Sequence, residues 1–161
     1  MPKQIRQKTD PILRQKAKAV TVLLPNAKID RIVSEMRAAL DAAEDGVALA
    51  APQIGVSLRL FIVSPKALGW RTDEPGLVFI NPCLVKRSHR KVELVEGCLS
   101  IRQVYGRIKR SEKVTIQALD AAGRRFTRHT AGLLAQIVQH EIDHLDGILF
   151  IDQAHDLTKV K

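Results

Sequence analysis

The segment His140-Glu141-Ile142-Asp143-His144, near the C-terminal end, constrains the fold more than any other part of the chain. Its two histidines are four residues apart, so on an α-helix their side chains lie on one face, about one turn from each other. Two imidazole nitrogens can then reach one metal ion at roughly 2.0–2.1 Å, with the intervening Glu141 beside the ion as a general base. The segment therefore predicts a helix that carries a hydrolytic metal centre.

The neighbouring sequence supports a helix from about Thr130 to Leu145. Thr130 is suited to cap its start, and Gly147 follows at the position typical of a C-terminal glycine. Apolar side chains recur before the first histidine, and they would anchor the helix in the core. These residues are Leu133, Leu134, Ile137 and Val138. The alternative, two histidines that never meet a metal, does not explain this placement.

Strands are predicted between this helix and an earlier one, which runs from about Ile29 to Asp45 with Asn26 or Asp30 as its cap and Gly46 at its end. The sequence shows no β-α-β alternation. We therefore expect an α+β fold, with largely antiparallel sheets packed around the C-terminal helix that carries the motif. The predicted strands are Leu58–Val63, Leu77–Ile80 (stopped by Asn81-Pro82), Lys113–Leu119 and, after a turn at 120–123, Arg124–Arg128.

Length and cysteine content restrict the class of protein further. The 161 residues suit one domain, 1–161, and the longest apolar runs fall far short of the roughly 20 residues needed to cross a bilayer. The first residues lack the apolar segment of a secretory signal. Two cysteines are too few for a disulfide scaffold, and Cys83 is expected to be a small buried apolar residue. We expect a cytoplasmic protein.

The chain is strongly basic, with a formal net charge of +9 and a pI near 9.9. Such a surface attracts RNA, DNA or anionic membranes through a sequence-independent interaction that salt weakens. Aromatic residues make up 4% of the chain and do not suggest a platform for stacking bases. A simple solvated basic surface is the alternative, and charge alone does not decide between them.

A hydrolytic site needs a third protein ligand and an open fourth position. In a metallopeptidase that ligand would come from the C-terminal tail, where His155 and Asp156 are candidates and Asp146 is too near His144. Cys98 is a candidate from the middle of the chain, where Gly97 would allow a close turn. A free cysteine is more often a small buried apolar residue. The residues alone leave these possibilities open.

Three segments together resemble the peptide deformylase family. They are GVALAAPQ at 46–53, EGCLS at 96–100 and QHEIDH at 139–144, and their order and separations also match. The likeness extends from about Asp10 to Asp152 and so covers nearly the whole chain. Each segment is weak evidence alone, whereas three in register are highly specific.

The resemblance implies that Cys98, His140 and His144 bind one divalent metal ion. The usual ion of the family is Fe(II), with Zn, Ni or Co as substitutes, and the spacing does not choose among these ions. A metal-bound water would attack the substrate carbonyl, its pKa lowered by the cation.

The resemblance also implies the catalytic groups. Glu141 would accept the proton of the water and later deliver it to the departing amine. The Gln53 side-chain amide and the Leu99 backbone N–H would stabilise the oxyanion.

The implied substrate is the N-formyl-methionine end of a newly made polypeptide, and the product is formate. An apolar pocket would hold the methionine side chain, and the peptide would lie extended beside the first segment. The predicted substrate-binding residues are Gly46, Val47, Ala48, Leu49, Leu133 and Ile137, although Leu133 and Ile137 could equally be plain core. The implied substrate emerges from ribosomes, which makes ribosomal RNA a candidate partner for the basic surface. Neither a membrane nor DNA is expected as a partner.

Two residues depart from the family pattern. Ala48 stands where the family usually has glycine, and alanine resists positive φ and close backbone approach. Arg102 stands where a proline is usual, near the expected mouth of the cleft.

A divergent hydrolase with an altered N-acyl substrate or low activity is therefore the second hypothesis. A non-catalytic metal-binding or RNA-binding module is the third, and it leaves Glu141 without a role. Asp143 is expected either to pair with Arg110 or to orient a metal ligand.

Overall fold

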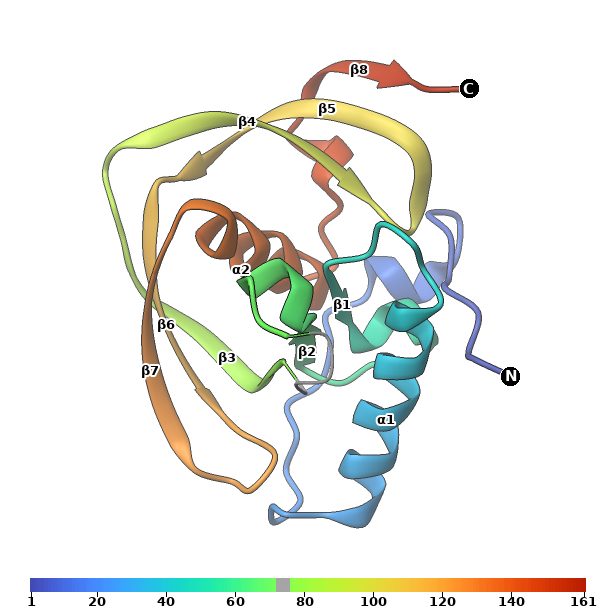
Figure 1. The fold of residues 1–161 in the computed structure, drawn as a ribbon, viewed down its shortest axis with the longest axis vertical. Coiled ribbons are helices and arrows are strands. Elements are labelled where there is room, and N and C mark those ends of the chain that lie inside the picture. The colour runs from blue at the N-terminus through green and yellow to red at the C-terminus, as the bar shows by residue number, and fades with distance from the viewer. Residues whose placement is uncertain (72–75) are drawn as a thin grey trace.

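The computed structural model describes residues 1–71 and 76–161, and it confirms the α+β class (Figure 1). Within these residues the strands form a sheet of order β1-β2-β3-β6-β7 and a second sheet of order β4-β5-β8, and neighbouring strands in both sheets are antiparallel. The helices are α1 (Ala27–Asp41) and α2 (Gly132–Leu145), with short 3-10 helices η1 (Pro11–Arg14), η2 (Ala51–Ile54), η3 (Pro65–Leu68) and η4 (Phe150–Asp152). The strands are β1 (Ala48–Ala50), β2 (Leu60–Val63), β3 (Leu77–Arg87), β4 (Lys91–Cys98), β5 (Ile101–Ser111), β6 (Lys113–Leu119), β7 (Arg125–Ala131) and β8 (His155–Lys159).

Helix α2 lies at the centre, with β6 and β7 to its left and β4 and β5 arching above it (Figure 1). Its apolar face, including Val138 and Leu145, belongs to one core cluster with residues of the five-stranded sheet. Phe61 and Phe79 stack within this cluster, with ring centroids 4.5 Å apart. The prediction of a central C-terminal helix is therefore confirmed.

Helix α1 begins at Ala27, two residues before the predicted start, and of the two predicted caps Asn26 is correct, because its side chain accepts hydrogen bonds from the Lys28 and Ile29 backbone N–H groups. Its predicted end was wrong: the helix stops at Asp41, and Gly46 lies in the connection that follows. Beyond Asp41 the backbone forms tighter turns, in which Gly46 N–H donates to the Ala43 carbonyl.

Strand β3 was predicted to stop at Asn81-Pro82, and this was wrong because the strand continues to Arg87. Asn81 adopts a φ of 51°, and its side chain bonds the Val20 backbone, accepting from N at 2.8 Å and donating to O at 2.9 Å. The pairing of β3 with β6 shifts register between Ile80 and Cys83, so an irregularity accommodates the proline. Cys83 is exposed, contrary to the expectation of a buried apolar residue.

The predicted turn at 120–123 leads into β7 as expected, but the predicted N-cap of α2 was wrong. Thr130 belongs to β7, which runs to Ala131, and its hydroxyl donates to the Val114 carbonyl. The N-cap position of α2 is Ala131, which makes no side-chain cap bond. Pairing with β6 thus carries the strand up to the first residue of the helix.

Strands β4 and β5 form a long hairpin that the sequence pattern did not predict. Only Leu99 and Ser100 connect them, and β8 from the C-terminal tail pairs with the other edge of β5. Gly97 was expected to form a close turn, but it lies inside β4 opposite Tyr105. A Cβ at this position would come within 2.7 Å of the Tyr105 ring, so the glycine permits a close approach.

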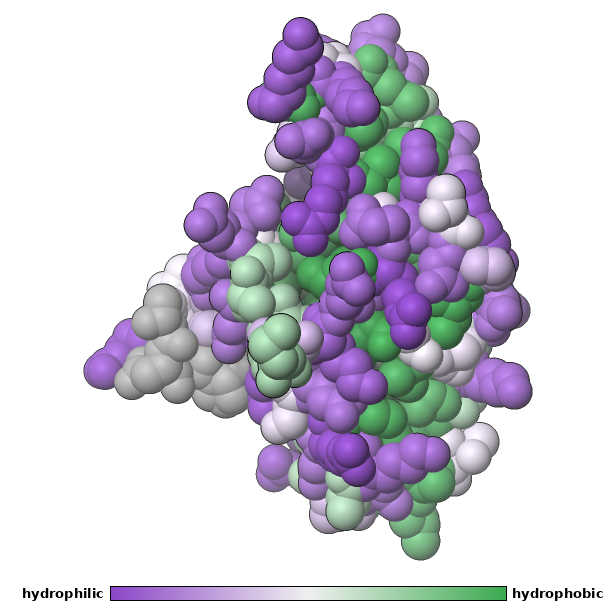
Figure 2. All heavy atoms as spheres, turned by 90° about the vertical axis from the view of Figure 1, so that its right-hand side faces the viewer, coloured by the Kyte–Doolittle hydropathy of each residue, from purple (hydrophilic) through white to green (hydrophobic). Residues whose placement is uncertain are grey.

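The surface is largely polar where it carries both chain termini. On this face hydrophilic side chains dominate, and apolar side chains are exposed in patches between them (Figure 2). Across residues 1–71 and 76–161, none of the helices combines the length and apolar character needed to span a membrane.

Gly147 ends α2 with a φ of +75°, and a Cβ there would come within 2.6 Å of the Arg14 carbonyl oxygen. Gly132, at the start of the helix, is a matched control, since its φ is +60° and an added Cβ would meet no described atom within 4 Å. We expect Gly132→Ala to lower the free energy of unfolding by about 1 kcal/mol, from backbone strain alone. Gly147→Ala should cost about 2–4 kcal/mol, because the clash adds to the strain. Urea unfolding measures both, and equal losses would contradict this account.

Candidate metal centre

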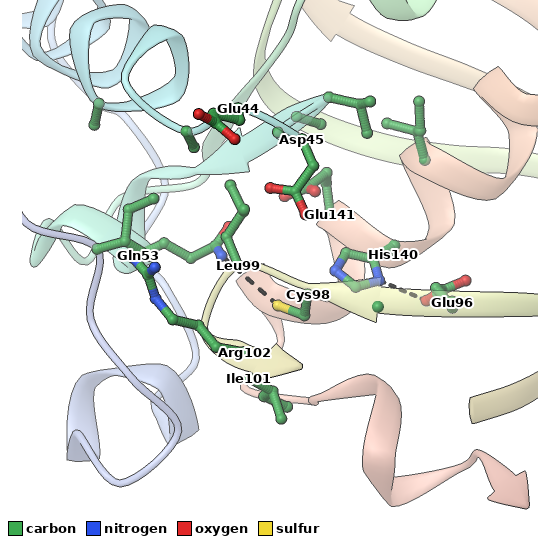
Figure 3. Close-up of a pocket in the computed structure, with 18 of the residues that line it drawn as sticks. Glu44, Asp45, Gln53, Glu96, Cys98, Leu99, Ile101, Arg102, His140 and Glu141 are labelled. Carbon is green, nitrogen blue, oxygen red and sulfur yellow. Dashed lines mark hydrogen bonds and ion pairs between the residues drawn. The ribbon is translucent and has the colours of Figure 1, made fainter. Parts of the chain in front are cut away.

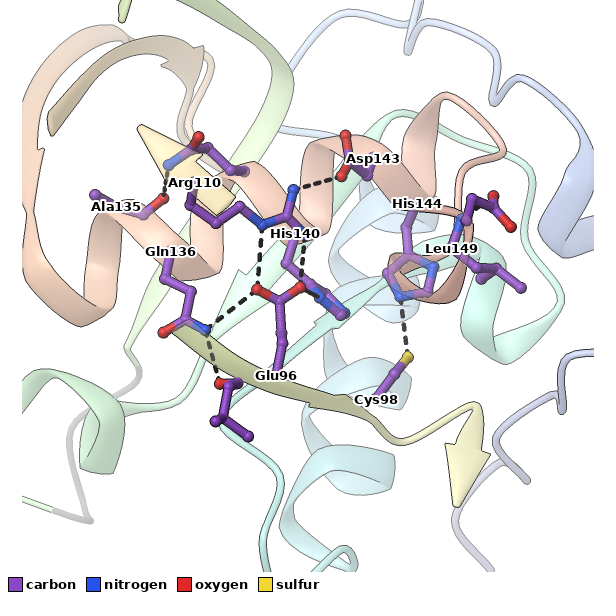
Figure 4. A network of polar contacts seen from close by, with 12 residues as sticks. Glu96, Cys98, Arg110, Ala135, Gln136, His140, Asp143, His144 and Leu149 are labelled. Atoms are coloured by element: carbon purple, nitrogen blue, oxygen red, sulfur yellow. Dashed lines mark hydrogen bonds and ion pairs between the residues drawn. The ribbon is translucent and has the colours of Figure 1, made fainter. Parts of the chain in front are cut away.

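Strand β4 and helix α2 bring three metal-binding side chains together. His140 and His144 lie one turn apart on α2, with ring centroids 5.0 Å apart, and Cys98 ends β4. The Cys98 Sγ lies 3.3 Å from His144 Nε2 (Figure 4), and one ligand atom from each of the three residues lies within 4.8 Å of the others. The arrangement can hold one metal ion, with a sulfur and two imidazole nitrogens as donors.

The C-terminal tail does not take part in this cluster. His155 lies in β8, where its Nε2 is 2.5 Å from a Glu93 carboxylate oxygen and its Nδ1 is 3.2 Å from Asp156. In the described part of the chain, Cys98, His140 and His144 are the one group of three such side chains. The geometry therefore disfavours a tail ligand of the metallopeptidase kind.

A buried carboxylate, Glu96, orients His140 from the second sheet (Figure 4). Its Oε1 lies 2.5 Å from His140 Nδ1, and Arg110 donates to both of its oxygens at 3.1 and 2.5 Å. Arg110 also donates to Asp143 at 2.6 Å. Of the two roles predicted for Asp143, the structure therefore shows the pairing with Arg110. Glu96 and Arg110 are only 6% and 5% exposed, so this pairing is largely shielded from water.

The environment keeps Glu96 ionised. Burial alone would raise the pKa of this carboxyl, but hydrogen bonds from His140 and Arg110 lower it to about 2. A carboxylate on Nδ1 leaves the other ring nitrogen of His140 for a metal, and it fixes the orientation of the ring. Glu96 belongs to the EGCLS segment at 96–100, but the sequence predicted no role for it. The signal was its place two residues before Cys98, which puts both side chains on one side of a strand.

The electrostatics of the cluster suit a cation. Burial would raise the pKa of the Cys98 thiol, but His144 and His140 lower it well below its ordinary value, which favours the thiolate. Burial would likewise lower the pKa of His140, but its bonds to Cys98 and Glu96 raise it well above normal. A divalent ion would compete with a proton for the His140 ring nitrogen that does not face Glu96, so the donor set fits a metal.

Glu141 lies between the two histidines in sequence and faces the cleft (Figure 3). It is 4% exposed, and its Oε2 has no hydrogen-bond partner among the described residues. Burial raises its pKa, although the nearby His140 and His144 counteract this. A carboxylate with a free oxygen beside these three candidate ligands is placed to exchange protons with a bound molecule.

Gln53 and Leu99 lie at the same cleft, from η2 and from the connection between β4 and β5. The Gln53 Nε2 donates to Ser100 Oγ at 3.0 Å and lies 3.8 Å from Cys98 Sγ. The structure thus brings both predicted oxyanion donors next to the cluster. Ser100, which the sequence analysis did not single out, bonds one of them.

The cleft has a volume of about 1230 Å³ and opens beside β1. Five of the six predicted substrate-binding residues line it, namely Gly46, Val47, Ala48, Leu133 and Ile137. Val47 and Leu133 are 37% and 51% exposed, which leaves apolar surface for a ligand. The Leu49 side chain is fully buried in the core with α1, so this residue can offer only its backbone to a ligand.

The two departures from the family pattern occupy different settings. Ala48 is an ordinary extended residue of β1 without positive φ, it is 7% exposed, and its side chain belongs to the core cluster around α2. The backbone at this position therefore does not require glycine. Arg102 is exposed and lines the cleft, as expected for a cation near its mouth.

Comparisons with known proteins agree with this architecture. The family model for polypeptide deformylase matches residues 2–160. Peptide deformylase 2 of Clostridium acetobutylicum is 42% identical over 157 residues, which cover 98% of this chain and 98% of that protein. A solved peptide deformylase from Legionella pneumophila is 40% identical, with a TM-score of 0.85 over 95% of this chain and 86% of that one. The crystal structure of a Synechococcus elongatus peptide deformylase in complex with actinonin is 34% identical, with a TM-score of 0.85 over 96% of this chain and 80% of that one. The chain belongs to the peptide deformylase family.

Proposed function

We propose that this chain removes the formyl group from the N-terminal formyl-methionine of newly made polypeptides and releases formate. The observation that carries the proposal is the buried Glu141, whose Oε2 has no hydrogen-bond partner among the described residues, beside the cluster of Cys98, His140 and His144. A purely structural metal site closes its fourth position with a protein ligand and needs no such base. Membership of the peptide deformylase family supports the same reaction.

Cys98, His140 and His144 would hold the metal ion, which we propose to be Fe(II), with Zn, Ni or Co able to replace it. When bound, the ion would polarise the formyl carbonyl and lower the pKa of water. The protein's contribution is to keep the donor set in place, since the Glu96 carboxylate holds His140 and the lowered pKa of Cys98 keeps the thiolate available.

Glu141 would act as the general base and then as the general acid. Its carboxylate takes a proton when water attacks the formyl carbon, and it returns that proton to the amine nitrogen as the C–N bond breaks. The raised pKa of Glu141 supports this role, because burial increases its proton affinity toward the working pH.

The Gln53 Nε2 and the Leu99 backbone N–H would donate to the oxygen that becomes negative during attack. Donors that are already in position stabilise this charge without reorganising, and losing one typically costs about 10²–10³ in rate. The bonds that hold Gln53 on the cluster side of the cleft support this role.

The exposed apolar surfaces of Val47 and Leu133, with Ile137 beside them, would accept the methionine side chain. Strand β1 pairs only with β2 among the described strands, so its other edge is available for an extended peptide. Backbone groups of Gly46 to Leu49 would bind the peptide there and leave later side chains largely unrecognised. The extended backbone at Ala48 supports normal rather than impaired turnover.

We propose that residues 1–161 act as one catalytic domain in the cytoplasm, on polypeptides that emerge from ribosomes. On the outer face of the five-stranded sheet, a hollow of about 490 Å³ is lined by Lys86, Lys113 and His129. Lys86 and His129 flank Thr115 in register across the three strands. This basic surface is suited to contact ribosomal RNA phosphates.

Glu141→Gln keeps the shape of the side chain but removes the base. We expect kcat for formate release from formyl-Met-Ala-Ser to fall about 10³-fold in the nickel-loaded protein, within the range found for general acid–base groups. Metal content should stay at that of the native chain, because Glu141 is not a ligand. The matched control is Glu112→Gln, at a surface glutamate that pairs with Arg90, and it should leave kcat unchanged. Equal rates for the native chain and Glu141→Gln would remove the proposed mechanism.

If the basic hollow contacts ribosomal RNA, ribosome binding should weaken as salt rises. The double substitution Lys86→Ala/Lys113→Ala should reduce both the affinity and its salt dependence, the log–log slope changing by about 1–2. Co-sedimentation with ribosomes at several salt concentrations measures this, with Lys28→Ala/Arg31→Ala on α1 as the control. Binding that does not respond to salt would contradict the electrostatic contact.

A further inference from the structure

The side-chain amide of Gln53 is fixed at both ends. Its Oε1 accepts a hydrogen bond from the Ala50 backbone N–H at 2.9 Å, and its Nε2 donates to Ser100 Oγ at 3.0 Å. Gln53 is 2% exposed and Ser100 is fully buried, so water does not compete for these bonds. The reverse orientation of the amide would set its NH2 group against the Ala50 N–H, donor against donor. The Ala50 contact therefore directs Nε2 toward the cluster.

Nε2 carries two hydrogens, and Ser100 accepts one of them. The other lies on the side of Cys98, whose Sγ is 3.8 Å from Nε2 (Figure 3). Because the contact to sulfur is weak, this hydrogen remains available to a better acceptor in the cleft. The Ser100 bond thus sets the direction of the donor that the proposed mechanism assigns to Gln53.

Ser100 follows Leu99, whose N–H is the other proposed donor, and these two residues form the connection between β4 and β5. The N-terminal segment 6–8 holds this connection in place. Gln7 Nε2 donates to the Leu99 carbonyl at 3.2 Å, and the backbone N–H at position 8 donates to the Ser100 carbonyl at 2.9 Å. The backbone N–H at position 6 donates to the Gln53 carbonyl at 2.8 Å. One segment therefore fixes the backbones of both donor residues relative to each other.

We infer that Ser100 is a positioning residue, whose hydroxyl holds the Gln53 amide so that Nε2 and the Leu99 N–H meet at one oxyanion. The inference rests on the proposed function, because the oxyanion is that of deformylation. Without the hydroxyl, the Gln53 amide keeps only its bond from the Ala50 N–H, so its terminal torsion covers a wider range of angles, since torsions of this kind have broad energy wells. A donor that is no longer oriented before the reaction stabilises the transition state less.

If the Ser100 hydroxyl served only as a buried hydrogen-bond partner for the fold, its removal would have different effects. Its loss would lower stability, and any effect on turnover would not depend on whether Gln53 is present. A double-mutant cycle separates the two roles. The variants are Ser100→Ala, Gln53→Ala and their combination, each loaded with nickel and assayed on formyl-Met-Ala-Ser.

We expect Ser100→Ala to lower kcat about tenfold with KM within about twofold, because the lost interaction belongs to the transition state. Gln53→Ala should lower kcat about 10²-fold. In the Gln53→Ala background, Ser100→Ala should add less than about twofold, since its target is gone. Losses that multiply in the combined variant would overturn the inference. The control Thr130→Val removes a buried hydroxyl that bonds the Val114 carbonyl, away from the cleft, and should not change kcat.

A second measurement does not depend on activity. In the zinc-loaded protein, the two Nε2 protons of Gln53 are identified in a proton–nitrogen NMR spectrum by their loss in Gln53→Ala. Ser100→Ala should bring their shifts closer together and speed their exchange with water. If Ser100→Ala does not fold, Ser100→Cys, which keeps a weaker acceptor, should give a partial change. If the shifts and the water exchange of the two Nε2 protons do not change in Ser100→Ala, the inference is overturned, whatever the effect on kcat. An altered pair in a chain that releases no formate supports the positioning role and overturns only the proposed function.

Discussion

The carboxylate of Glu96 joins the three-stranded sheet to helix α2, and the geometry of the candidate metal centre depends on this junction. Glu96 and Cys98 are two residues apart on β4, so one strand presents the partner of His140 and the sulfur that faces His144. A buried carboxylate is costly unless it is paired, and Arg110 pairs with it from β5 while also bonding Asp143 on α2. The network therefore sets how β4 and α2 lie together.

The remaining features of the site follow from where this junction places α2. The helix presents His140 and Glu141 toward the cleft, and β1 lies on the opposite side with one edge unpaired among the described strands. The connection between β4 and β5 then closes the site near Gln53. Metal ligands, base and oxyanion donors thus come from separate elements that meet because the sheets pack around one helix.

The sequence predicted best what depends on local pattern. The helical spacing of the histidines predicted α2, alternating residues predicted β6, and Asn26 was one of the two caps predicted for α1. Contacts between distant segments were harder to predict: β3 passes through Asn81-Pro82 because Asn81 bonds the Val20 backbone. The strands β4 and β5 carry many charged residues and no clean alternation, so their pairing and the bond from Glu96 to His140 were missed. The place of Glu96 beside Cys98 on one strand was the available signal.

Titration of the metal-free chain with Co(II) tests the central claim most directly. A thiolate ligand gives cobalt a near-ultraviolet charge-transfer band, and we expect it to saturate at one ion per chain and to be absent in Cys98→Ala. Glu96→Gln should keep the band but weaken cobalt binding about 10- to 100-fold, the usual effect of losing a partner that orients a ligand. Glu93→Gln, at a surface carboxylate that contacts His155, should bind as the native chain does. A band that persists in Cys98→Ala, or an unchanged affinity in Glu96→Gln, would contradict the account.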